Sequence, residues 1–280
     1  MSLANHLIIV CGHAIWLGGP RKGYDEAEWL IESYKAGETP TFIEHIKAGV
    51  EALGKDERAI LMFSGGPTRK ETRISEARSY ANLAAANSYF GLLPTVEWPA
   101  DVEAHPLSPI PLHPRVMLEE QALDSYYNIL FSILQFWRAT GCRTWPERIT
   151  IVSHAFKRTR IVDGHCAAIG FALDRVRFIG INPPNLPPEL SGGDQGKQGG
   201  VVSQEKANAM QDVQLVVGQW EEDPHGISQA LAGKRVKRNV WGVNQMLLLS
   251  DEERRKSGLK TRFIGTDMEA LSDDTDRPWS

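Results

Sequence analysis

Cysteine is scarce in this chain, which has three of these residues among 280, and no two of them form a CxxC pair. Because Cys11, Cys142 and Cys166 are odd in number and far apart, the sequence encodes neither a disulfide framework nor a zinc knuckle. The chain also lacks a basic N-terminal segment followed by a long apolar run, and no stretch approaches the ~18–20 apolar residues of a membrane-spanning helix. We therefore expect a cytoplasmic protein with no membrane partner.

Positive charge is not in excess either, since 31 Lys and Arg residues stand against 35 Asp and Glu residues, a formal net charge of −4. Such a chain has no global attraction for nucleic acid or for an acidic membrane surface, so any basic site must be local. We expect no nucleic-acid partner. The composition does not indicate an oligomeric state.

Several catalytic and nucleotide-binding motifs are missing. The chain has no GxGxxG with a downstream acid and no GxxxxGK[ST], so it encodes neither a standard dinucleotide site nor a P-loop. GxSxG is absent too, which disfavours a triad with Cys11 or Ser64 as the nucleophile and His13 or His154 as the base. We expect Cys11 to be a small buried hydrophobe rather than a thiolate.

Metal-ligand spacing is also missing. The histidines considered as ligands have no two-residue or four-residue spacing with one another, and they are His13, His154, His165 and His225. Since zinc sites usually draw ligands from such local pairs, the spacing makes zinc improbable, and we predict no metal ligands.

What the chain does contain is a series of strand-like apolar segments that alternate with helical patterns. The expected strands cover residues 7–10, 59–63, 116–119, 149–153 and 176–181. The expected helices cover residues 25–37, 41–54, 75–90, 121–139, 156–170 and 203–220. This alternation predicts a mostly parallel sheet with helices on both sides, in which ligands bind beyond the C-terminal strand ends.

The composition changes after residue 182. Residues 183–202 are rich in Pro, Gly and Gln and predict a flexible loop, after which too little chain remains to fold easily alone. We therefore expect an α/β domain over residues 1–182 and a helical C-terminal extension, residues 203–280, packed on the same domain. The charged tail from Asp251 is expected to fray.

Glycines and polar side chains follow the expected strands. Gly12 and His13 follow the first strand, and Ser64, Gly65 and Gly66 end the second, where backbone amides could approach an anion closely.

The strand at 149–153 leads into a basic segment. Its end carries Ser153 and His154, which as neighbours on a strand face apart and so do not form a ready nucleophile and base. Lys157, Arg158 and Arg160 follow at once and suit a phosphate, pyrophosphate or carboxylate.

Acidic and polar residues gather where the longest apolar helix is expected to begin. This group comprises Glu119, Glu120, Asp124, Ser125 and Asn128. Two interpretations stay open, namely helix capping, and acid or base chemistry by Glu119 or Asp124. The basic segment 234–238 also has several interpretations: a nuclear-localisation or nucleic-acid patch, a solvated helix face, or cations that close the anion site.

Several short motifs follow one another along the chain in a definite order: Ser64-Gly65-Gly66, Ser75-Glu76-Ala77, Glu119, Asp124-Ser125, Asn128, Val152-Ser153 and Arg160. As an ordered set, over residues 7 to about 181, they resemble the motifs of the DUF218 family, and the chain is most similar to its soluble fungal branch. The resemblance implies a Rossmann-like three-layer fold. It also implies that these residues line or buttress one site: Gly12, Ser64, Gly65, Gly66, Glu76, Glu119, Asp124, Ser125, Asn128, Ser153 and Arg160.

Two positions depart from the family pattern. Asp124-Ser125 stands where bacterial members commonly have Asn-Thr, and Lys157 stands where they have a histidine. If that histidine is catalytic in the family, His154 is the candidate to replace it here.

We predict a protein that binds a phosphate-bearing or nucleotide-like anion and, if catalytic, performs hydrolysis or group transfer. Whether it is an enzyme stays open. The resemblance also makes S-adenosylmethionine a candidate cofactor and a methyltransferase-like activity an alternative. A non-catalytic adaptor that uses the basic segment 234–238 is the other alternative.

Overall fold

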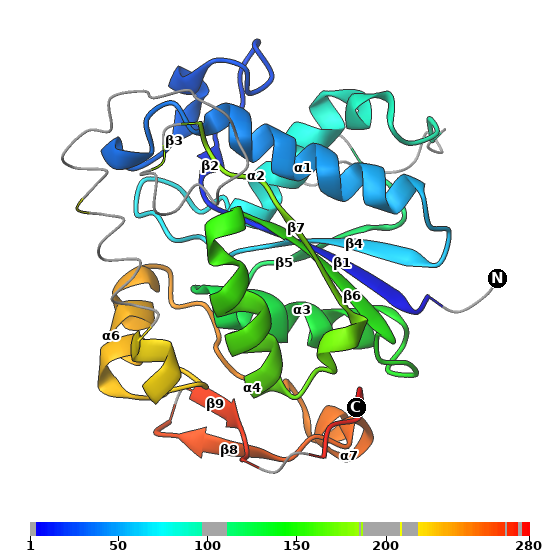
Figure 1. The fold of residues 1–280 in the computed structure, drawn as a ribbon, viewed down its shortest axis with the longest axis vertical. Coiled ribbons are helices and arrows are strands. Elements are labelled where there is room, and N and C mark those ends of the chain that lie inside the picture. Colours follow the sequence, from blue (N-terminus) through cyan, green and yellow to red (C-terminus); the bar gives the residue numbers. More distant parts are fainter. Residues whose placement is uncertain are drawn as a thin grey trace.

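The computed structural model describes residues 4–96, 111–184, 186, 208, 218–266, 268–273 and 276–280. Its central sheet has five strands, all parallel, in the order β5-β4-β1-β6-β7 (Figure 1). Their bounds are β1 His6–Cys11, β4 Ala59–Ser64, β5 Val116–Glu119, β6 Arg148–Ser153 and β7 Val176–Gly180. The predicted Rossmann-like α/β fold is confirmed.

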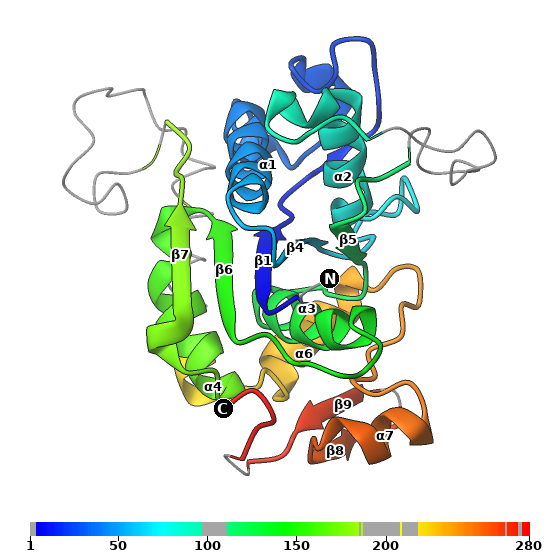
Figure 2. The same ribbon diagram turned by 90° about the vertical axis from the view of Figure 1, so that its right-hand side faces the viewer.

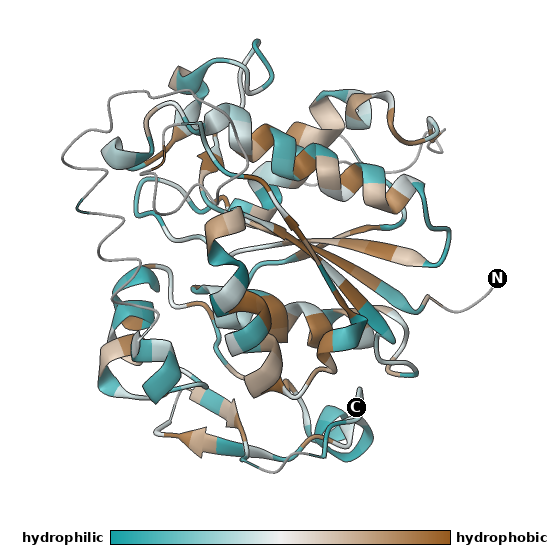
Figure 3. Ribbon diagram, viewed as in Figure 1, coloured by the Kyte–Doolittle hydropathy of each residue, from teal (hydrophilic) through white to brown (hydrophobic). Residues whose placement is uncertain are grey.

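The sheet is covered on both faces, as Figure 2 shows, with α1 and α2 on one side and α3 and α4 on the other. The helices are α1 Thr39–Gly54, α2 Glu76–Ala86, α3 Ser125–Ala139 and α4 Ala167–Ile169. Successive strand residues point to opposite faces, so Ile8 and Val10 pack under α1 and α2 while Leu7 and Ile9 pack against α3. Strands buried on both faces must be apolar throughout, which explains the continuous hydrophobic colouring of the central strands in Figure 3.

Four predicted helices have different boundaries or a different form. The helix predicted over 75–90 covers only Glu76–Ala86 and is followed by a 3₁₀ turn, Ser88–Gly91. The helix predicted over 121–139 begins at Ser125, because Asp124 is its N-cap and accepts a hydrogen bond from the Tyr127 amide. The helix predicted over 41–54 begins at Thr39. The prediction of a helix over 25–37 is wrong: this segment forms two short 3₁₀ turns and the strand β3 (Trp29–Leu30), paired with β2 (Ile15–Trp16).

The segment after β6 is helical, as predicted, but irregular. A 3₁₀ turn, Ala155–Lys157, is followed by a π-helix, Thr159–Cys166, and then by α4, which ends at Gly170 with φ 76°. Wide π-helical turns occur often at functional sites, because the extra residue in the turn redirects side chains.

The C-terminal extension contains helices and, in addition, a hairpin. Its described elements are α6 Gln229–Arg238, α7 Asp251–Ser257, β8 Thr261–Ile264 and β9 Met268–Leu271. The prediction of a frayed tail after Asp251 is wrong, because Ser250 caps α7 and the Trp279 ring, 2% exposed, packs against Trp145. Most of the predicted loop 183–202 and of the predicted helix 203–220 lies outside the described residues. Within these ranges the structure describes only residues 183, 184, 186, 208 and 218–220.

The extension shares the hydrophobic core on the α3 side of the sheet, to which it contributes Leu231, Leu247 and Leu271. No helix within the described residues has the length and apolar character needed to cross a membrane. The strand order places the topological switch point between β1 and β6, where crossovers leave in opposite directions and a crevice opens beyond the strand ends.

Candidate functional site

A cavity of about 520 Å³ lies at this switch point. Its wall is formed by the loops after β1 and β6, the start of α3, and one side of α6. Basic side chains in the wall outnumber acidic ones by seven to four. The cavity is of the size that holds a small organic ligand, and its charge favours an anion.

Gly12 lines the cavity, but not as an amide donor, because its N–H donates to the Ser64 carbonyl at 2.8 Å. Its lack of a side chain serves another purpose. A Cβ at this position would lie 2.5 Å from Glu76 Cβ, so glycine is what allows α2 to begin against the end of β1. Glu76 itself lines the cavity, accepts a hydrogen bond from Thr68 and has its pKa raised by burial.

The second glycine loop does not supply amides to the cavity either. Gly65 donates its N–H to the Glu119 carbonyl at 3.0 Å, and Gly66 donates to the Ala122 carbonyl at 2.6 Å. Ser64 is fully buried, does not line the cavity, and donates its hydroxyl to the Glu119 carboxylate at 2.5 Å. The predicted amide donors are therefore wrong, and Ser64 is not placed to act as a nucleophile.

Glu119 is a structural carboxylate rather than an accessible acid or base. It is 3% exposed, lies outside the cavity wall, and accepts hydrogen bonds from Ser64 and from the amides of Gln121 and Ala122. Burial raises the pKa of Glu119 to about 7 even though these hydrogen bonds lower it. The side chain joins β4 to the turn before α3 and has no oxygen directed at a ligand.

Asp124 does line the cavity, but both of its carboxylate oxygens are engaged. One caps α3 through the Tyr127 amide at 3.0 Å, and the other pairs with Arg235 at 2.9 Å. Of the two interpretations of this acidic group, capping therefore has the support of the geometry. Glu120 is directed away to Ser75 and Arg78.

The remaining predicted residues of this group lie in the cavity wall. Ser125 Oγ is 2.9 Å from His165 Nε2, and the Asn128 side-chain carbonyl accepts the Ser64 hydroxyl at 3.1 Å. Cys11 also lines the wall, and burial raises the pKa of its thiol to about 12, as expected for a thiol packed like a hydrophobe.

Two of the three predicted cations face the cavity. Lys157 and Arg160 line it, and no carboxylate of the described residues forms an ion pair with either. Arg160 Nε is buried and has no hydrogen-bond partner within the described part of the chain. Burial, reinforced by Arg160, lowers the pKa of Lys157 to about 7, and burial lowers the pKa of Arg160 to about 10. Arg158 instead points to solvent beside Asp163.

The basic segment 234–238 also reaches the cavity. Lys234, Arg235 and Arg238 belong to its wall, in line with the interpretation that these cations close the site. Arg235 is 3% exposed, whereas Arg238 is exposed and donates to the Leu123 carbonyl.

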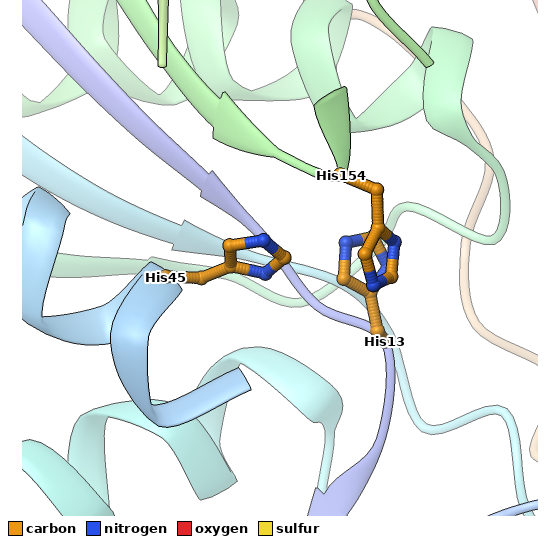
Figure 4. A group of neighbouring side chains, drawn as sticks. All are labelled: His13, His45 and His154. Carbon is orange, nitrogen blue, oxygen red and sulfur yellow. The ribbon is translucent and has the colours of Figure 1, made fainter. Parts of the chain in front are cut away.

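Three histidines meet at the edge of the cavity next to Lys157. His13 follows β1, His154 follows β6 and His45 reaches in from α1, as Figure 4 shows. The His13 and His154 rings stack with centroids 4.2 Å apart, and His45 meets the His154 ring edge-on at 4.9 Å. Ser153 Oγ is 3.2 Å from His13 Nε2.

Sequence reasoning missed part of this site. His45, Lys35 and Glu38 carry no local signal, because they lie between predicted strands in segments whose patterns indicate only turns or helix. His45 meets His13 and His154 through tertiary contact, which spacing along the chain does not reveal.

No protein-family model matches the chain, and no solved structure matches it. Among curated proteins, the chain is 26% identical over 205 residues to "Uncharacterized protein YOR238W" of Saccharomyces cerevisiae. The aligned region covers 63% of this chain and 67% of the yeast protein. The functional inference therefore depends on the geometry of the cavity.

Proposed function

We propose that the protein binds a small anion, phosphate-bearing or nucleotide-like, in the cavity at the switch point, and that it hydrolyses or transfers a group of that molecule. The observation that carries the proposal is the pair Lys157 and Arg160, two basic side chains in the cavity wall that form no ion pair with a carboxylate of the described residues. Cations held together away from water are costly unless an anion accompanies them.

The charge distribution indicates where the anion sits. Lys35 and Arg69, also in the wall, both pair with Glu32, at 2.8 and 2.9 Å, and Arg235 pairs with Asp124. These three cations share two carboxylates. Lys157 and Arg160, near the start of the π-helix, form no ion pair within the described residues, and Arg160 Nε has no hydrogen-bond partner there. We therefore propose that the anion lies beside them.

Membership of the DUF218 family and a cytoplasmic location belong to the same proposal. Of the residues that the resemblance implies, Gly12, Asp124, Ser125, Asn128 and Arg160 lie in the cavity wall. Two further members of that set, Glu76 and Ser153, lie there as well. The cytoplasmic location rests on the cysteines, which are all free.

Thermal-shift measurements test the binding step. Pyrophosphate, nucleotides and sugar phosphates should raise the melting temperature of the native protein, because ligand that binds only the folded state stabilises it by RT ln(1 + [L]/Kd). Arg160→Gln should remove most of that shift. Arg158→Gln is the matched control. It also removes one arginine, two positions before Arg160, but the Arg158 side chain is 59% exposed and points to solvent.

The outcomes separate the alternatives. A shift with S-adenosylmethionine alone would favour the methyltransferase-like alternative, and loss of the shift in Arg158→Gln to the same degree would show nonspecific charge attraction. No shift with any of these compounds would refute the proposal. Compounds that do stabilise the protein should then release phosphate or a transferred group when incubated with the wild type, and more slowly with Arg160→Gln.

A further inference from the structure

The three histidines at the cavity edge bring their ring nitrogens close to one another. One nitrogen from each of His13, His45 and His154 can be chosen so that all three lie within 4.8 Å of one another. The side chains are 8%, 0% and 3% exposed, respectively. Burying polar imidazoles is costly, so three of them in one place require a physical reason.

The hydrogen bonds of His45 fix which of its nitrogens is free. Its Nε2 lies 2.8 Å from the carbonyl oxygen of Ile181, which can only accept, so Nε2 carries the proton. Nδ1 then carries the ring's lone pair, and this buried atom has no hydrogen-bond partner within the described residues. Metal-ligating histidines usually have this arrangement, with one nitrogen held by a backbone carbonyl and the other directed at the metal.

The contacts of His13 follow the same pattern. Its Nδ1 is 3.4 Å from Lys157 Nζ. The protonated lysine can only donate, so Nδ1 offers it a lone pair. The opposite nitrogen, Nε2, then donates to Ser153 Oγ. Lys157 Nζ therefore lies where a metal cation could accept the lone pair of His13 Nδ1.

We propose that His13, His45 and His154 bind a divalent transition-metal ion, Zn²⁺ in preference to Mg²⁺. Three imidazoles suit zinc, copper, nickel or iron, whereas magnesium requires oxygen ligands. A tetrahedral zinc with bonds of roughly 2.1 Å needs nitrogens roughly 3.4 Å apart, so each ring must move inward by about 1 Å. For two of the rings, burial also favours the neutral form that binds metal, since it lowers the pKa of His45 to about 4 and that of His13 well below its usual value.

The place of the site in the cavity indicates its type. His13 and His154 are both part of the cavity wall. Three protein ligands leave one coordination position for water or for a ligand oxygen, which is the arrangement of a catalytic rather than a structural zinc. Glu38, whose carboxylate is 3.8 Å from His154 Nε2, lies where it can orient that ring.

Metal binding can be measured without the anion, so this inference and the proposed function can fail separately. The full chain, stripped of metal with a chelator, should take up one equivalent of Zn²⁺ in isothermal titration calorimetry. With Co²⁺ it should show the visible absorption of a tetrahedral site. Mg²⁺ should give neither signal.

Variants locate the site. His45→Gln should weaken Zn²⁺ binding by roughly 100-fold or more, since it removes one of three ligands. The matched control is His113→Gln, which removes another buried imidazole from a position beside Tyr89, outside the cavity wall, and should leave the affinity within about twofold.

Lys157→Met keeps all three histidines and removes the competing ammonium. Because like charges repel strongly at this distance, the variant should bind Zn²⁺ at least about tenfold more tightly. This prediction stands even if His45→Gln fails to fold. Less than one equivalent of Zn²⁺ in the wild type, equal weakening in His113→Gln, or unchanged affinity in Lys157→Met would overturn the assignment and leave the rings as packed aromatics.

Discussion

The ion pair between Asp124 and Arg235 should be among the most sensitive contacts in the fold. Arg235 is 3% exposed, donates to Asp124 at 2.9 Å and to the Gly226 carbonyl at 2.5 Å, and stacks over Tyr127 at 4.7 Å. It connects α6 of the C-terminal extension to the N-terminus of α3. Breaking a buried pair by removing one partner typically costs about 3–5 kcal/mol, because the other charge stays buried and uncompensated.

Replacing Arg235 with Met should therefore lower the free energy of unfolding by about 3–5 kcal/mol. Asp124→Asn should cost less, about 2 kcal/mol, because asparagine is a good N-cap and still accepts the Tyr127 amide. The double variant Asp124→Asn with Arg235→Met should be less destabilised than the sum of the two, with a coupling of about 2 kcal/mol. Urea unfolding followed by tryptophan fluorescence measures all four proteins.

Two results would refute this reasoning. A coupling below about 0.5 kcal/mol would mean that the two side chains act independently and that the pair does not join α6 to α3. A stable Asp124→Asn variant that binds the anion normally but no longer turns it over would instead restore Asp124 as an acid or base.

Three further changes test other parts of the fold. Gly12→Ala should lower the free energy of unfolding by about 1–3 kcal/mol, because the new Cβ would lie 2.5 Å from the first residue of α2. The control Gly233→Ala, whose Cβ would meet nothing within 4 Å, should be neutral or slightly stabilising in the same unfolding assay. Burial raises the pKa of Asp56, but hydrogen bonds, among them one from His6, outweigh burial and lower this pKa to about 2. The ionised Asp56 thus contributes about 1–2 kcal/mol to the free energy of unfolding above pH ~4, and this contribution is lost towards pH 2. Between pH 5 and 2.5, the free energy of unfolding of Asp56→Asn should therefore fall less steeply than that of the wild type. Trp279→Ala should cost about 3 kcal/mol if the C-terminus is docked, and a melting temperature equal to the wild type would show a frayed tail.

The central fold could be predicted because its signals are local. Apolar runs such as Leu7 to Val10 can be buried on both faces only in a parallel sheet covered by helices, and the alternation of strands with helices leaves few other topologies. Errors occurred where capping and tertiary contact override propensity. The helix after Leu123 starts late because Asp124 caps it, and residues 25–37 form turns and a strand that pairs with β2.

The candidate site was predictable in its place and its charge, but not in its chemistry. The strand order brings the ends of β1 and β6 to one crevice, so Gly12, Ser153 and Arg160 were predicted to lie there and do. Glu119, Gly65 and Gly66 were assigned to the ligand because they follow strands, yet their polar groups are satisfied by the backbone and by Ser64. A sequence shows which groups are near a strand end and does not show which of them are already hydrogen-bonded.

The sequence alone thus determined the parallel sheet, the edge at which a ligand can bind and the positive charge of that edge, because these follow from residue patterns a few positions long. Only the tertiary structure decided how the cations are paired: within the described residues Arg160 Nε has no hydrogen-bond partner, whereas Arg235 pairs with Asp124. It also decided that His45, on α1, meets His13 and His154. Such pairings join segments that are far apart in the chain, and they depend on how helices pack on the sheet rather than on local spacing.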